Sequence, residues 1–166
     1  MVIEAPYSKY CRTNFKIAIA VCIGGAILFA YDGYLSKYEW SLRRSFYEEH
    51  VKEGKPDSDM VFNQEAPFVL IPLAAVLTIW FLIKRNKKII ADEKELIINA
   101  KEKIPYDSIQ KIDKTYFDSK GYFIITYKKD SRKAGAHDGV EVNRKLNARK
   151  YDNLKAVLEH LVTKIT

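Results

Sequence analysis

His50 is the residue of this sequence whose neighbours most suggest chemistry. It lies beside Glu48 and Glu49 and three positions before Glu53, so one helical face could present an imidazole and a carboxylate. Zinc sites usually add further imidazole or thiolate ligands, and residues 36–65 contain no second histidine and no cysteine. A solvated helix face is the simpler interpretation, and no metal ligands are predicted.

The remaining candidates for catalysis do not form a recognisable constellation. His137 and Asp138 are neighbours on a predicted loop, and neither Ser119 nor Ser131 has a histidine and an orienting acid at motif spacing. The seven glycines are scattered or lie in apolar sequence, so no phosphate-binding loop is predicted. The sequence therefore predicts a non-enzymatic protein with no catalytic residues and no cofactor.

Two groups of basic residues are the strongest candidates for binding. The first group directly follows an apolar run and consists of Lys84, Arg85, Lys87 and Lys88. The second group lies on a predicted hairpin and consists of Lys128, Lys129, Arg132 and Lys133. A basic residue beside a bilayer contributes about 1 kcal/mol of attraction to anionic lipid, so both groups are candidates for contact with lipid headgroups or a partner. For the second group a solvated loop is the favoured interpretation.

The charged residues are distributed unevenly along the chain. The whole sequence has 28 lysines and arginines against 21 aspartates and glutamates, and residues 84–166 alone have 20 against 12. Residues 17–31 and 66–83 contain no charged residue, which excludes a simple soluble domain. A domain that is held at a membrane and lacks a nucleic-acid-binding motif is not predicted to bind nucleic acid.

The two uncharged runs predict a hairpin of two transmembrane helices. Residues 66–83 would extend about 27 Å as a helix, which is close to the thickness of a hydrocarbon core. The first run is shorter, but apolar and aromatic residues extend it, so the predicted first span is 17–35. A cleaved signal peptide is the alternative for the first run, although no small-residue cleavage site follows it.

Small residues predict where the two spans pack against each other. They are Ala20 and Gly24 in the first span and Ala74 and Ala75 in the second. Packing within the hairpin is the favoured interpretation, and contact with a helix of another membrane protein is the alternative.

Charge bias predicts the orientation of the hairpin. Basic residues dominate 1–16 and follow the second span, whereas the loop 36–65 is acidic overall, so both termini are predicted to be cytoplasmic. Between Tyr34 and Glu53 there is no glycine or proline, so the first helix is expected to continue outside the membrane as an amphipathic rod. Gly54 and the residues after it are expected to end that rod.

Residues 84–166 change to short β-type runs followed by one helix, which predicts a cytoplasmic α+β domain. Strands are expected at 88–91, 95–99, 109–117, 121–127 and 139–143. The helix is expected at 148–165, with Asn147 as its cap and an apolar stripe that includes Leu154, Leu158 and Leu161. An antiparallel sheet of this size needs a layer over one face, and this helix is the available candidate.

This order of strands and a terminal helix behind a membrane hairpin resembles that of the bacterial pleckstrin-homology-like membrane proteins. The resemblance covers about residues 84–166 and is carried by three segments, at 90–98, 103–112 (with Ile-Pro-Tyr-Asp-Ser-Ile) and 121–127. It implies a partly open barrel of antiparallel strands capped by the helix, and a binding or scaffolding role. The expected strands are one or two fewer than the seven of that barrel.

These observations lead to one main hypothesis and two alternatives. The main hypothesis is a two-pass protein of the bacterial inner membrane whose cytoplasmic domain docks a protein partner, as an accessory subunit of a larger membrane complex. The expected partners are other membrane-protein subunits or a cytoplasmic protein, with membrane lipids around the hairpin. One alternative is a module that contacts anionic phospholipid, and the other is a membrane sensor whose outer helix responds to a ligand.

Overall fold

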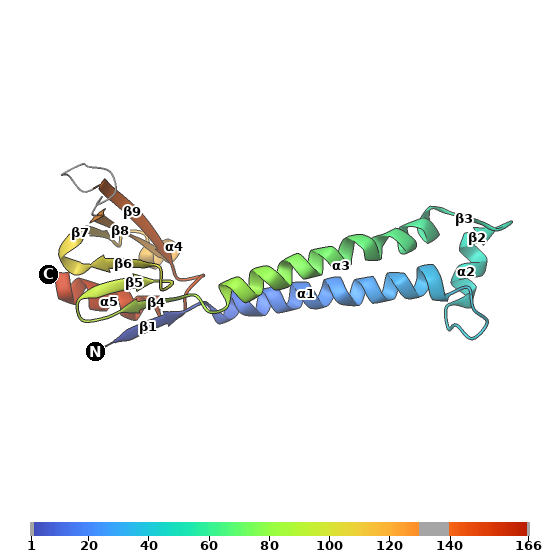
Figure 1. Cartoon of the computed structure of the whole chain (residues 1–166), viewed down its shortest axis with the longest axis horizontal. Helices are drawn as coiled ribbons and strands as arrows, with labels where there is room; N and C mark the ends of the chain where they lie inside the picture. The colour runs from blue at the N-terminus through green and yellow to red at the C-terminus, as the bar shows by residue number, and fades with distance from the viewer. Residues whose placement is uncertain (1, 130–139, 166) are drawn as a thin grey trace. The chain divides into compact units, whose positions relative to one another are not determined.

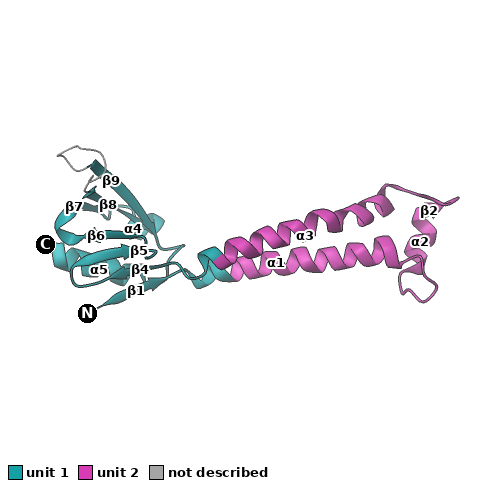
Figure 2. Ribbon diagram, viewed as in Figure 1, with its two compact units in different colours: residues 1–12, 83–166 teal, residues 13–82 magenta. Residues whose placement is uncertain are grey.

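The computed structural model describes residues 2–129 and 140–165 and divides into two units (Figure 2). One unit, the sheet domain, consists of residues 1–12 and 83–166. The other, the helical hairpin, consists of residues 13–82. The chain therefore leaves the sheet domain once, forms the hairpin and returns.

Two long helices dominate the helical hairpin (Figure 1). Helix α1 (Lys9–Ala30) continues into a π-helical turn, η1 (Tyr31–Leu35), and α3 (Ser58–Lys84) follows the outer loop. Among the described residues these two helices, of 27 residues each, are long and apolar enough to cross a membrane. Both predicted spans lie inside them.

At Gly33 the backbone that follows α1 lies in close contact with the backbone of α3. A Cβ atom at this position would lie 2.8 Å from the backbone of Asn63, so any side chain would collide with α3. Gln64 donates a hydrogen bond from Nε2 to the Gly33 carbonyl (3.1 Å), and the Tyr34 hydroxyl donates to the Gln64 carbonyl (2.8 Å). Glycine is required here because the two backbones are in contact.

Of the small residues that were expected to pack between the spans, Ala74 is buried. Ala20 and Ala75 are exposed, and an added Cβ at Gly24 would meet nothing within 4 Å. The packed face of α1 instead includes Gly25, whose added Cβ would lie 3.3 Å from Leu70, and the buried residues Cys22 and Ala26. Positions 20 and 24 are about one helical turn apart, so they share a face of α1. That face is not the one that contains Cys22, Gly25 and Ala26.

The expected amphipathic rod does not form beyond Leu35. The chain turns back and only Arg44–His50 are helical again (α2), because polar contacts replace the continuing helix. Arg43 binds Asp32 through two hydrogen bonds of 3.0 Å, and the Tyr31 hydroxyl accepts one from the backbone of Leu42 (3.3 Å).

A short hairpin of β2 (Val51–Lys52) and β3 (Lys55–Pro56) follows α2. Glu53 and Gly54 at its turn both have positive φ, of 54° and 76°. Gly54 thus lies in a β-turn and does not end a helix, because α2 already ends at His50.

The sheet domain contains two antiparallel sheets (Figure 1). The first has the order β1 (Ile3–Pro6), β4 (Lys88–Ala91), β5 (Glu95–Ile98) and β6 (Glu102–Pro105). The second has the order β7 (Ile109–Asp113), β8 (Tyr122–Lys129) and β9 (Val140–Asn147). A 3-10 turn, η2 (Tyr106–Ser108), connects the sheets, and α4 (Phe117–Lys120) lies between β7 and β8. Strands and a terminal helix are thus confirmed.

Two strands of the first sheet were not predicted. Ile3–Pro6 pair with β4, from Ile3 opposite Ala91 to Pro6 opposite Lys88, although residues 1–16 were expected to form a separate cytoplasmic segment. β6 also escaped prediction, because its four residues alternate too briefly to give a clear pattern. With these two, the described part of the sheet domain has seven strands.

Helix α5 (Leu154–Ile165) closes the core of the sheet domain. Its buried residues are Leu154, Val157, Leu158 and Leu161, which confirms most of the predicted stripe. The helix begins later than the expected residue 148, because Asn147 ends β9 and Asn153 has a left-handed φ of 61°. Asn147 accepts a hydrogen bond from the backbone of Arg149 (2.8 Å) in the preceding turn.

The contact at Gly33 leads to a matched pair of substitutions. Gly33→Ala should destabilise the hairpin by about 1–3 kcal/mol, because the added methyl overlaps the α3 backbone, which cannot rotate away. Gly24→Ala should be neutral or stabilising, since its Cβ is unobstructed and alanine favours a helix. Thermal unfolding of the full chain in detergent, followed by circular dichroism, checks both. Equal stability of the two variants would contradict the close approach.

Candidate functional site

The first predicted basic group lies where α3 returns to the sheet domain, between α3 and β4. Lys88 forms an ion pair with Glu4 of β1 (2.7 Å), so part of the charge of this group is neutralised. The Lys87 carbonyl accepts a hydrogen bond from the backbone of Tyr7 (2.8 Å). The group, which also includes Lys84 and Arg85, is therefore next to the residues that precede α1.

The second predicted basic group does not join the first. Lys128 and Lys129 are the last residues of β8, opposite Glu141 and Val140, whereas Arg132 and Lys133 lie outside the described residues. Tyr122, at the other end of β8, is about 23 Å from Lys129 at 3.3 Å per residue. Lys128 and Lys129 thus lie at the opposite end of β8 from Tyr122.

The loop between β9 and α5 contacts the same segment, residues 7–11, that the first basic group contacts. The Lys150 carbonyl accepts a hydrogen bond from the backbone of Ser8 (2.8 Å), and the Arg149 carbonyl accepts one from the Cys11 thiol (3.1 Å). Asp152 accepts one from the backbone of Lys9, the first residue of α1 (2.8 Å). No local pattern in the sequence indicates where this loop lies, because the position of β1 decides it.

A pair of stacked tyrosines forms an aromatic surface on the second sheet. Tyr116 is 41% exposed and its ring centroid lies 5.5 Å from that of Tyr122. Lys120 lies 4.7 Å from the Tyr116 ring and Lys145 lies 3.5 Å from the Tyr122 ring. We call these four residues the aromatic patch. A cation over the face of an aromatic ring is attracted electrostatically to the ring, so these two lysines hold the tyrosine rings in place.

Tyr127, in contrast, lies in the core and is not a surface residue. Its side chain is 3% exposed and its hydroxyl donates a hydrogen bond to Glu102. Burial, and then this hydrogen bond, raise the pKa of Tyr127 to about 12. Glu102 also binds Arg144 (2.9 Å), so the carboxylate connects β6 to both β8 and β9.

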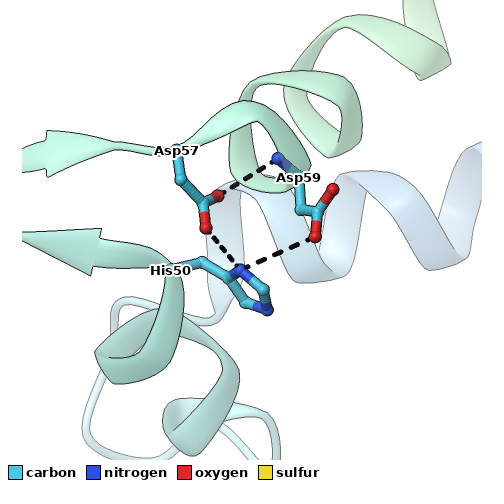
Figure 3. Close-up of side chains that lie close together, drawn as sticks. All are labelled: His50, Asp57 and Asp59. Atoms are coloured by element: carbon cyan, nitrogen blue, oxygen red, sulfur yellow. Dashed lines mark hydrogen bonds and ion pairs between the residues drawn. The ribbon is translucent and has the colours of Figure 1, made fainter.

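His50 contacts two aspartates that sequence analysis did not connect with it (Figure 3). Its Nδ1 lies 2.7 Å from Asp57 Oδ2 and 3.9 Å from Asp59 Oδ2. The β2–β3 hairpin brings these residues together, whereas the glutamates near His50 in sequence do not take part. The other Asp57 oxygen, Oδ1, accepts hydrogen bonds from the backbone of Met60 (3.0 Å) and of Asp59 (3.1 Å).

These three side chains could hold a metal ion by type and spacing, since their ligand atoms lie within 4.8 Å of one another. Their contacts already give Asp57 a structural role: one oxygen caps the start of α3 and the other pairs with His50. The hydrogen bond to Asp57 is the main cause that raises the pKa of His50. The Met60 amide is the main cause that lowers the pKa of Asp57. The cluster fastens α2 and the β2–β3 hairpin to α3.

Comparisons of the chain with protein-family models, with curated proteins and with solved structures found no match.

The His50–Asp57 pair predicts that the stability of the loop between the two long helices depends on pH. Because the folded pKa of His50 is raised above 6.5, the pair stabilises fully below pH 6.5 and its contribution is lost as pH rises through the folded value. An NMR titration of the His50 ring in the full chain should show this raised pKa. Asp57→Asn should return it toward 6.5 while the amide still caps α3.

Asp59→Asn is the control for that titration, because Asp59 is farther from the ring and is the last of the causes that raise its pKa. It should shift the His50 titration less than Asp57→Asn does. If the pKa of His50 is the same in Asp57→Asn as in the wild type, the His50–Asp57 ion pair is contradicted.

Proposed function

We propose that this chain is a two-pass, non-enzymatic protein of the bacterial inner membrane. On this proposal its sheet domain is a pleckstrin-homology-like module that docks a protein partner, as an accessory subunit of a larger membrane complex would. The membrane part is supported by the two long apolar helices. The orientation, with both termini cytoplasmic, is supported by the basic residues at the sheet-domain end and the acidic outer loop.

The pleckstrin-homology-like assignment is supported by the arrangement of the sheet domain. A four-stranded and a three-stranded antiparallel sheet surround one core, and the terminal helix α5 packs onto that core. The strands expected from the sequence were fewer than seven. β1, which precedes the helical hairpin in the chain, is one of the additional strands.

The docking role is carried by the aromatic patch. Tyrosine provides a large contact area at low cost in conformational entropy, and aromatic residues are enriched where proteins bind each other. Tyr116 and Tyr122 are already stacked, so little ordering is needed on binding. Residues 84–166 have 20 basic against 12 acidic residues, so charge complementarity favours an acidic partner.

The proposed orientation predicts which positions a membrane-impermeant thiol reagent reaches. In a chain with Cys11 and Cys22 changed to serine, Ser58→Cys at the start of α3 should be labelled in intact cells. Ser119→Cys in α4 should be labelled only after the cells are opened, because the sheet domain faces the cytoplasm. Both side chains are exposed, so access and not burial decides the result. The reverse pattern would contradict the orientation.

The docking proposal predicts a position-specific crosslink. A photoreactive benzoylphenylalanine at position 116 of the full chain, in its native membrane, should form a discrete adduct with a protein. The same group at Lys101, an exposed residue in the turn between β5 and β6, should not. Tyr122→Ala should reduce the adduct at 116, because it removes the stacked ring. Equal adducts at 116 and 101, or adducts with lipid alone, would contradict docking at this patch.

A further inference from the structure

We infer that His50, Asp57 and Asp59 form a binding site for a divalent transition-metal ion, with zinc as the representative ion (Figure 3). One imidazole nitrogen and two carboxylate oxygens are ligand types that zinc accepts, and these atoms lie within 4.8 Å of one another. The imidazole favours a transition metal over Ca²⁺ or Mg²⁺, which prefer oxygen ligands. The inference goes beyond the proposed function and depends neither on docking of a partner nor on orientation in the membrane.

The separations of the three ligand atoms suit one small ion. Zinc lies about 2.0–2.2 Å from nitrogen and carboxylate ligands, so two ligands of a tetrahedral ion lie about 3.3 Å apart. His50 Nδ1 is 2.7 Å from Asp57 Oδ2 and 3.9 Å from Asp59 Oδ2, one shorter and one longer than this value. The Asp59 side chain is 72% exposed, so it can rotate toward the ion without disturbing a packed contact.

The charges of the site also favour a cation. Two carboxylates lie beside one imidazole, and in the part of the chain that the structure describes no lysine or arginine forms an ion pair with either aspartate. A divalent ion would balance both negative charges. To bind it, His50 Nδ1 must present its lone pair, so a proton on this nitrogen moves to Nε2 or to the solvent.

Two of the three ligands are held in place before a metal binds. The Phe46 ring packs against the His50 ring, with centroids 4.3 Å apart, and the backbone of Asp57 donates a hydrogen bond to the His50 carbonyl (2.9 Å). The backbone amides of Asp59 and Met60 occupy Asp57 Oδ1, which leaves Oδ2 for the ion. A site whose ligands already converge loses less entropy on binding.

Asp59 distinguishes a metal site from a cluster that only fastens the loop. Its carboxylate lies 3.9 Å from the imidazole, which is too far for a hydrogen bond, whereas Asp57 both caps α3 and binds His50. Loss of the Asp59 carboxylate should therefore change the metal-free loop very little. In a metal site the same change removes one of three protein ligands.

The test measures zinc binding by the full chain, without an affinity tag, in detergent. Isothermal titration calorimetry at a pH of about 8, where protons compete little for the imidazole, should show one tightly bound Zn²⁺ that excess Mg²⁺ does not displace. Bound zinc should also raise the midpoint of thermal unfolding. Asp59→Asn and His50→Gln should each weaken zinc binding about tenfold or more. Without metal, Asp59→Asn should unfold at the wild-type midpoint.

Glu53→Gln is the matched control, because it removes one exposed negative charge from the turn between β2 and β3 but none of the three ligands. Its affinity for zinc should stay within about threefold of wild type, since an exposed charge that does not touch the ion contributes little. Equal losses in Asp59→Asn and Glu53→Gln, or no loss in Asp59→Asn, would overturn the site. Tight zinc binding that survives His50→Gln, or displacement of zinc by Mg²⁺, would also overturn it.

Discussion

The pairing of β1 with β4 is the contact on which the sheet domain depends. β1 precedes the first long helix and β4 follows the second, so the pairing closes a long loop whose entropic cost grows only slowly with length. The hairpin reduces that cost because it returns the chain to its starting point. Ala5 is fully buried, and Asn153 donates a hydrogen bond to the Glu4 carbonyl (3.2 Å), so β1 also positions the start of α5. Neither the residues before the helical hairpin nor those after it complete the core of the sheet domain alone.

The same pairing decides which basic residues form a common surface. With β1 in the sheet, Ser8 and Lys9 bind the loop before α5, and this contact places Lys150 beside the first turn of α1. Lys128 and Lys129 carry as much charge but lie at the far end of β8. The sequence therefore identifies the basic residues, whereas the fold decides which of them lie near one another.

Sequence reasoning succeeded where local pattern was sufficient and failed where distant segments meet. The runs at β4, β5 and β8 alternate clearly, and the uncharged runs are long, so these elements could be predicted. β1 has four residues and a partner on the far side of the hairpin, which no local signal reveals. β7 ends at Asp113, earlier than expected, because its side chain accepts a hydrogen bond from the backbone of Thr115 (3.0 Å) and starts a turn.

The outer loop shows how two ion pairs overrule a favourable helical pattern. The spacing of apolar residues after Tyr34 suits a continuing helix, yet Asp32 binds Arg43 through both carboxylate oxygens and draws the chain back. His50 then binds Asp57, which caps the next helix. A helix that continued from Asp32 through Arg43 would separate these two side chains, because they are eleven residues apart. The Asp32–Arg43 contact therefore favours the conformation in which the chain turns back.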